Sequence, residues 1–125
     1  MENLNIEATE YTPKIILDAQ NNLIDIRGDS FPENTFDFYK PVTKWLKQYF
    51  DEGNKNVVIN IEINYFNSSS SQLFFDVFDM FEAASEKQNS LEINWIYSAK
   101  NESAQEAGED FVDEFESLNI NLIEQ

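Results

Sequence analysis

The chain has 125 residues, 42% of them hydrophobic, which is enough to bury a core and predicts one folded domain over residues 1–125 rather than disorder. Its 24 acidic and 8 basic residues give a net charge of −16, which disfavours nucleic acids and anionic membranes as partners. The chain has no cysteine, which excludes disulfides, and no histidine, which removes the commonest general base and transition-metal ligand.

Short apolar runs fill the N-terminal segment. Residues 1–10 lack the basic and apolar regions of a signal peptide, and no later run is long enough to span a bilayer, so we expect a soluble cytoplasmic protein. A turn around Pro13 separates the first two runs, and residues 20–22 are typical of a hairpin turn. Three strands that open an antiparallel sheet are therefore predicted over residues 4–9, 14–19 and 22–28.

The hydrophobic period changes to three and four residues over 29–53, which predicts a helix. Pro41 lies inside this segment, where a proline removes a hydrogen bond and clashes with the preceding turn. We therefore expect the helix proper to begin near Pro41, with one kinked helix as the alternative. The aromatic residues of FPENTFDFYKPV (31–42) are interpreted as packing at the start of this helix, in preference to a docking surface.

Strands and helices alternate over the rest of the chain. Strands are predicted over 57–66, 91–98 and 119–124, and helices over 69–88 and 99–118. The complete order is β-β-β-α-β-α-β-α-β, which is typical of an α/β protein with a mixed β-sheet flanked by helices. The acidic stretch 102–116 is interpreted as a solvated helix face, and no pattern predicts a metal or cofactor site.

The stretch YFNSSSSQ (65–72) joins a predicted strand to a predicted helix. A flexible linker is disfavoured because both neighbours are apolar elements, and a catalytic serine is disfavoured because the chain has no histidine to activate it. An enzyme is therefore not expected. The composition favours two interpretations equally. The polar residues can cap the helix, or one serine can carry a phosphate that the first-turn amides and the helix dipole favour. These polar residues are Asn67, Ser68, Ser69, Ser70 and Ser71.

The helix after the serines has a wider apolar arc than one sheet face needs. We expect one side of this helix to pack on the core. We expect Phe74 and Phe78, which are four residues apart, to form a partner-facing stripe that begins one turn beyond the serines. A phosphate beside such a stripe would oppose docking, because a desolvated charge is costly. Burial of both rings in the free protein would contradict this hypothesis.

Several separate segments of the sequence resemble the SiaC family of bacterial regulatory phosphoproteins. They are MENLNIEATEYTPKIILDA, FPENTFDFYKPV, YFNSSSSQ, INWIY, EAGEDF and the NLIE ending. The resemblance implies a fold similar to the STAS domains of anti-sigma-factor antagonists. It also implies a switch that is phosphorylated by a serine/threonine kinase with a histidine-kinase-like ATPase fold and dephosphorylated by a PP2C-type phosphatase. The unphosphorylated form would bind and activate a diguanylate cyclase, in cyclic-di-GMP signalling and surface attachment.

Carried onto this sequence, the resemblance places the phosphate on the residue after Asn67, where the family motif has Thr and this chain has Ser68. Ser69 and Ser70 are the less favoured acceptors. Capping by Asn67 and the later serines is compatible with phosphorylation, and the resemblance decides in favour of the switch. The alternative function is a constitutive acidic adaptor that binds a basic protein surface, with the serines acting only as a helix cap.

Overall fold

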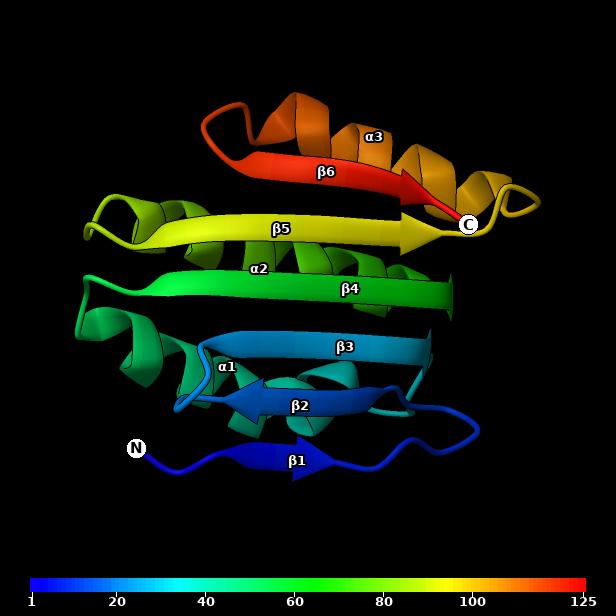
Figure 1. Cartoon of the computed structure of the whole chain (residues 1–125). Helices are drawn as coiled ribbons and strands as arrows, with labels where there is room; N and C mark the ends of the chain where they lie inside the picture. The colour runs from blue at the N-terminus through cyan, green and yellow to red at the C-terminus, as the bar shows by residue number, and fades with distance from the viewer.

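The computed structural model describes residues 1–125, which form six strands and three helices in the predicted order. Figure 1 shows the strands side by side in one sheet, with the N-terminal strand at one edge and the C-terminal strand at the other. The elements are β1 (Leu4–Ile6), β2 (Lys14–Asp18), β3 (Leu23–Ser30), α1 (Thr35–Asp51), β4 (Asn56–Phe66), α2 (Ser68–Ser85), β5 (Ser90–Tyr97), α3 (Glu102–Glu114) and β6 (Asn119–Glu124). The predicted mixed α/β fold is confirmed.

The strand order in the sheet follows the order in the chain, β1-β2-β3-β4-β5-β6. The first three strands pair antiparallel, and β3 to β6 pair parallel through the three helical crossovers. Such crossovers are right-handed, and here each helix leads to the next strand in the same direction across the sheet. All three helices therefore lie on one face of the sheet, and the other face has no helix on it (Figure 1).

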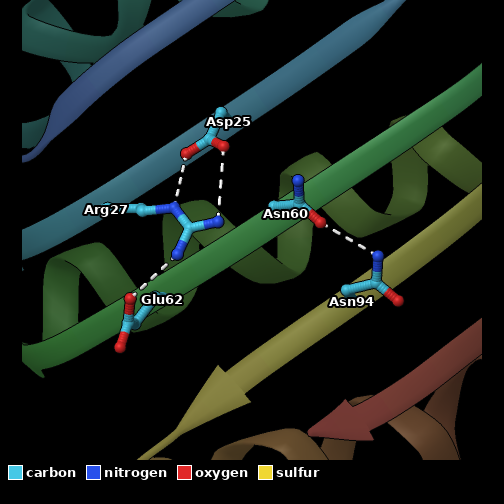
Figure 2. A network of polar contacts seen from close by, with 5 residues as sticks. All are labelled: Asp25, Arg27, Asn60, Glu62 and Asn94. Atoms are coloured by element: carbon cyan, nitrogen blue, oxygen red, sulfur yellow. Dashed lines mark hydrogen bonds and ion pairs between the residues drawn. The ribbon is translucent and has the colours of Figure 1, made fainter.

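The two faces of the sheet differ in chemistry as this arrangement requires. The helix-covered face holds buried aliphatic residues such as Ile59 and Ile61. The uncovered face carries polar side chains that pair across neighbouring strands (Figure 2). There Arg27 donates to Asp25 of the same strand at 2.8 Å and, across to β4, to Glu62 at 3.2 Å. In the same layer the amide of Asn94 donates to the Asn60 side chain at 2.9 Å, and Asn121 donates to Asn94 at 3.1 Å. Such cross-strand pairs stabilise the register while the uncovered face stays polar.

The prediction that the first helix begins near Pro41 is wrong. Helix α1 begins at Thr35 and runs through Pro41 to Asp51, so the alternative is correct in that the segment forms a single helix. The side chain of Asn34 accepts a hydrogen bond from the Asp37 amide at 3.2 Å, so the helix is capped upstream of the proline. Thr35 and Tyr39 are also buried in the first turns. Capping and packing together outweigh the hydrogen bond that Pro41 cannot make.

The other helices are shorter than predicted, because their polar ends are turns. The core between the helices and the sheet is rich in aromatic rings. Phe78 of α2 stacks on Phe111 of α3 with ring centroids 4.2 Å apart, and Phe111 also contacts Trp95 of β5 edge-on at 5.0 Å. Helix α3 therefore packs on α2 as well as on the sheet. No helix is both long and apolar enough to cross a membrane.

Candidate functional site

The serine-rich stretch lies where β4 ends and α2 begins. Asn67 is the N-cap, with an extended backbone, and its side-chain oxygen accepts a hydrogen bond from the Ser70 amide at 2.9 Å. Ser68 is the first residue of α2. The carboxyl ends of parallel strands and the start of a helix meet here, which is a common position for a site in α/β folds. First-turn amides and the helix dipole favour an anion at this point.

The serines of α2 have different environments. Ser68 and Ser69 are exposed, and Ser71 is partly buried. Ser70 is fully buried, with 0% of its surface exposed. The hydroxyls of Ser69 and Ser71 make no hydrogen bond, and that of Ser70 bonds into the interior, so the side-chain cap is Asn67 alone. Ser70, one of the less favoured acceptors, is inaccessible to a kinase in the folded protein.

A buried chain of hydroxyl groups lies beneath the exposed serines. The Ser70 hydroxyl lies 2.8 Å from that of Ser30, at the end of β3, and the Ser30 hydroxyl lies 2.6 Å from the phenol of Tyr39 in α1. Burial raises the pKa of Tyr39 to about 12, although the hydrogen bond with Ser30 opposes this shift. Three elements that meet under the serine-rich stretch are thus joined by neutral hydrogen bonds, which fix the start of α2 in one place.

A polar hollow of about 350 Å³ lies beside Ser68, between the start of α2 and the side of α3. Its wall includes Ser71, Ser103 and two carboxylates, Glu106 and Asp110. No lysine or arginine lines it. A phosphate on Ser68 would therefore have the amides of the helix start on one side and like charges on the other. This part of the acidic stretch borders the serines, and nothing in the sequence pattern indicates that the two segments are neighbours.

The expectation that Phe74 and Phe78 face a partner is wrong. Their exposed fractions are 1% and 0%. Phe74 contacts Tyr39 and Trp95 edge-on, and Phe78 stacks on Phe111. The wide apolar arc of α2 is explained by three neighbours instead of one, because α2 packs on the sheet, on α1 and on α3.

Three aromatic residues lie at the same end of the sheet as Ser68, and one of them, Phe31, belongs to the segment that was interpreted as packing at the start of the first helix. Tyr11 is 55% exposed and Tyr65 is 57% exposed, and the ring of Phe31 packs edge-on between them at 5.3 and 5.2 Å. We call Tyr11, Phe31 and Tyr65 the aromatic surface. It is tied to the loop because the Phe31 amide donates to the Tyr11 carbonyl and the Asn67 amide donates to the Ser30 carbonyl.

The alternation of Val57 to Ile63, continued by two residues, would place Tyr65 on the core face of β4. The structure breaks this alternation with a β-bulge. Gly28 pairs with Ile63, but the next residue of β3, Asp29, pairs with Tyr65, so Asn64 is an extra residue. A bulge reverses the direction of the side chains that follow. The signal in the sequence was Gly28, whose φ of +135° is one that other residues rarely adopt.

Comparisons with known proteins point to one family. Residues 6–125 match the model of the family described as SiaC family regulatory phosphoprotein. The structure is similar to SiaC of Pseudomonas aeruginosa, with a TM-score of 0.91, 26% identity and full coverage of both chains. It is equally similar to a chain in the crystal structure of the diguanylate cyclase SiaD in complex with its activator SiaC from Pseudomonas aeruginosa. The TM-score there is 0.90 at 27% identity, over 98% of this chain and 99% of that chain. An uncharacterised protein of Pseudomonas aeruginosa (strain UCBPP-PA14) is 30% identical over 111 residues, which cover 89% of this chain and 88% of the relative.

Proposed function

Because this chain belongs to the SiaC family of regulatory phosphoproteins, as its sequence motifs predicted, we propose that it is a non-enzymatic phospho-switch. Its unphosphorylated form binds and activates a diguanylate cyclase, and so controls cyclic-di-GMP signalling and surface attachment. The observation that carries this proposal is a structural similarity over nearly the whole chain. The similar chain belongs to the crystal structure of the diguanylate cyclase SiaD in complex with its activator SiaC.

Ser68 is the proposed phosphoacceptor. Its hydroxyl is exposed at the first position of α2, directly after the Asn67 cap, so a kinase can reach it without unfolding the helix. Ser69 is exposed as well, at the next position, and is the remaining alternative. The alignment of the family motif with YFNSSSSQ supports Ser68.

The proposed mechanism of the switch is electrostatic and steric. Phosphorylation adds a charge of about −1.5 to −2 and three strong acceptor oxygens. In the hollow beside Ser68 this charge would lie near Glu106 and Asp110, with no basic side chain to balance it. Burying that charge under a docked partner would be costly. The aromatic surface supplies the apolar contact that the bare protein offers to the cyclase, since exposed tyrosines are frequent anchors in interfaces.

The proposed modifying enzymes are a serine/threonine kinase with a histidine-kinase-like ATPase fold and a PP2C-type phosphatase. The family resemblance supports both. A kinase that uses ATP and a cyclase that uses GTP place the switch in the cytoplasm, where these nucleotides occur.

The test of the acceptor is direct. The chain is incubated with its cognate kinase and ATP, and the phosphate is mapped by mass spectrometry. Ser68→Ala is expected to abolish phosphorylation, whereas Ser69→Ala, a matched control one residue away, keeps it. Undiminished phosphorylation of the Ser68→Ala protein would contradict the assignment of Ser68 as the phosphoacceptor. A cyclase that binds with strong salt dependence but never responds to the kinase would support the constitutive adaptor instead.

A further inference from the structure

The basic residues of this acidic chain are unevenly distributed. Of its eight lysines and arginines, four line one groove between α1 and α2. The groove has a volume of about 650 Å³, and apolar side chains including Leu46, Phe50, Met80 and Ala84 line it. The basic residues that line it are Lys40, Lys44, Lys47 and Lys87.

Three of these lysines make no salt bridge. Lys87 pairs with Asp51 at 2.5 Å, whereas no carboxylate lies within 4 Å of Lys40, Lys44 or Lys47. These three residues are spaced i, i+4 and i+7, so they form a row along one side of α1, about 10 Å long at 1.5 Å per residue. Like charges at this spacing repel one another and weaken a helix slightly. The row gains no salt bridge in the free protein, and its one favourable interaction is the longer-range attraction of Lys47 for Asp51, which, beside the hydrogen bond from Lys87, helps to lower the pKa of that carboxyl.

We propose that this groove, which we call the lysine groove, binds an acidic amphipathic helix of a partner protein. A helix that lies along the groove can place apolar residues against Met80, which is partly exposed, and Ala83, which is exposed. Carboxylates at i, i+4 and i+7 on its flank would then meet Lys40, Lys44 and Lys47. Recognition of an amphipathic helix in an apolar groove is a common mode of binding, and complementary charge sets its orientation.

The charge of the whole molecule supports a protein helix over other anions. At a net charge of −16, a long nucleic acid or a lipid surface would be repelled by everything around the groove. A single helix contacts only the local row of positive charge. The lysine groove is formed by residues 40–51 and 80–87, far along α2 from Ser68, so this contact is separate from the proposed switch.

The test uses a synthetic helical peptide of about 16 residues, long enough to form helix in water. It carries Glu at i, i+4 and i+7 beside a stripe of Leu, and a matched peptide has Gln in place of Glu. Binding is measured by fluorescence anisotropy and mapped by amide chemical shifts. We expect shifts at residues 40–51 and 80–87, and an affinity for the Gln peptide that is lower by about tenfold.

Variants of the protein separate the groove from bulk charge. Lys44→Glu/Lys47→Glu is expected to weaken binding by about tenfold or more, and Lys14→Glu/Lys100→Glu, which changes the net charge equally at lysines outside the groove, by less than about threefold. Lys44→Gln/Lys47→Gln repeats the test without placing a carboxylate next to Asp51. Ala83→Trp, at an exposed position that lines the groove, is expected to block the peptide without changing charge.

Several results would overturn the proposal. One is that the Glu peptide does not bind the folded wild-type protein. Another is that Lys44→Glu/Lys47→Glu and Lys14→Glu/Lys100→Glu weaken peptide binding equally. Self-association that Lys44→Glu/Lys47→Glu abolishes would identify a second copy of the chain as the occupant. Binding to phosphatidylserine vesicles that the same variant abolishes would identify a lipid surface. Ser68→Ala is expected to leave peptide binding unchanged, which distinguishes a failure here from a failure of the switch.

Discussion

At the scale of the residue, neighbouring serines in the same stretch do different things. Ser68 and Ser70 are two positions apart on a helix, so their side chains leave it in nearly opposite directions. Once Asn67 fixes where α2 begins, Ser68 faces solvent and Ser70 faces the core. The sequence could indicate a cap and an acceptor within the stretch. It could not separate the serines, because that depends on the position of the helix start and on Ser30, which is remote in sequence.

Ser70→Ala should destabilise the protein by about 1 kcal/mol, because it removes the buried hydrogen bond to Ser30. The exposed Ser69→Ala control should change the free energy of unfolding by less than about 0.5 kcal/mol. Urea denaturation measures both. Equal stability of the two variants would mean that the buried hydroxyl chain does not hold the start of α2.

The buried phenol of Tyr39 predicts a loss of stability at high pH. Its pKa is raised to about 12 in the folded protein, from an ordinary value of 10, so the unfolded chain loses this proton first. The stabilising contribution of Tyr39 is complete below pH 10 and decreases as the pH rises toward 12. Tyr39→Phe should remove a loss of about 2 kcal/mol over this range, measured by denaturation at a series of pH values. An identical alkaline decline in both proteins would contradict this assignment.

At the scale of the element, the packing of neighbouring elements determines which side chains are buried, and hydrophobic periodicity alone did not show this. A helix that contacts only a sheet needs one apolar side, and α2 has a wider one because α1 and α3 also lie against it. Sequence periodicity detected the excess of phenylalanine but could not identify these neighbours. In β4 the alternation was correct as far as Ile63, after which one extra residue turned Tyr65 outward.

Replacing one buried ring and one exposed ring by alanine should distinguish residues that stabilise the core from residues that bind the partner. Phe78→Ala is expected to cost about 3–5 kcal/mol of stability, because its ring is buried against Phe111. Tyr65→Ala should cost about 1 kcal/mol or less, since its ring is largely exposed, yet weaken binding to the cyclase. Thermal unfolding and isothermal titration calorimetry report the two effects. Unchanged cyclase affinity in Tyr65→Ala would exclude this residue from the docking surface.

The position of α3 predicts an effect on the phosphate itself. Carboxylates of Glu106 and Asp110 disfavour the dianion, so the second pKa of phosphorylated Ser68 should lie above its ordinary value of about 6. Glu106→Gln/Asp110→Asn should lower that pKa, as followed by phosphorus NMR during a pH titration. The control Glu109→Gln/Asp113→Asn removes the same charge from positions outside the hollow and should shift the pKa less. An equal shift in both variants would show that only net charge matters.

At the scale of the whole molecule, the order of elements and the mixed sheet followed from the sequence because every strand and helix has a clear hydrophobic period. The sequential strand order did not follow, since many orders satisfy the same pattern. That order places every helix on one face and leaves the other to the pairs of Arg27 with Asp25 and Glu62. It also brings Tyr11, Phe31 and Tyr65 from three segments to the end of the sheet where Ser68 lies.

The affinity of the protein for its cognate diguanylate cyclase, with and without phosphate on Ser68, tests the switch most directly. Calorimetry would compare the bare chain, the chain phosphorylated stoichiometrically by the kinase, and Ser68→Ala treated in the same way. The bare chain and the treated Ser68→Ala chain should bind equally. The phosphorylated chain should bind weaker by about 100-fold, since a phosphate would be desolvated in the contact. Unchanged affinity of the phosphorylated chain would contradict the proposal that phosphate on Ser68 controls docking.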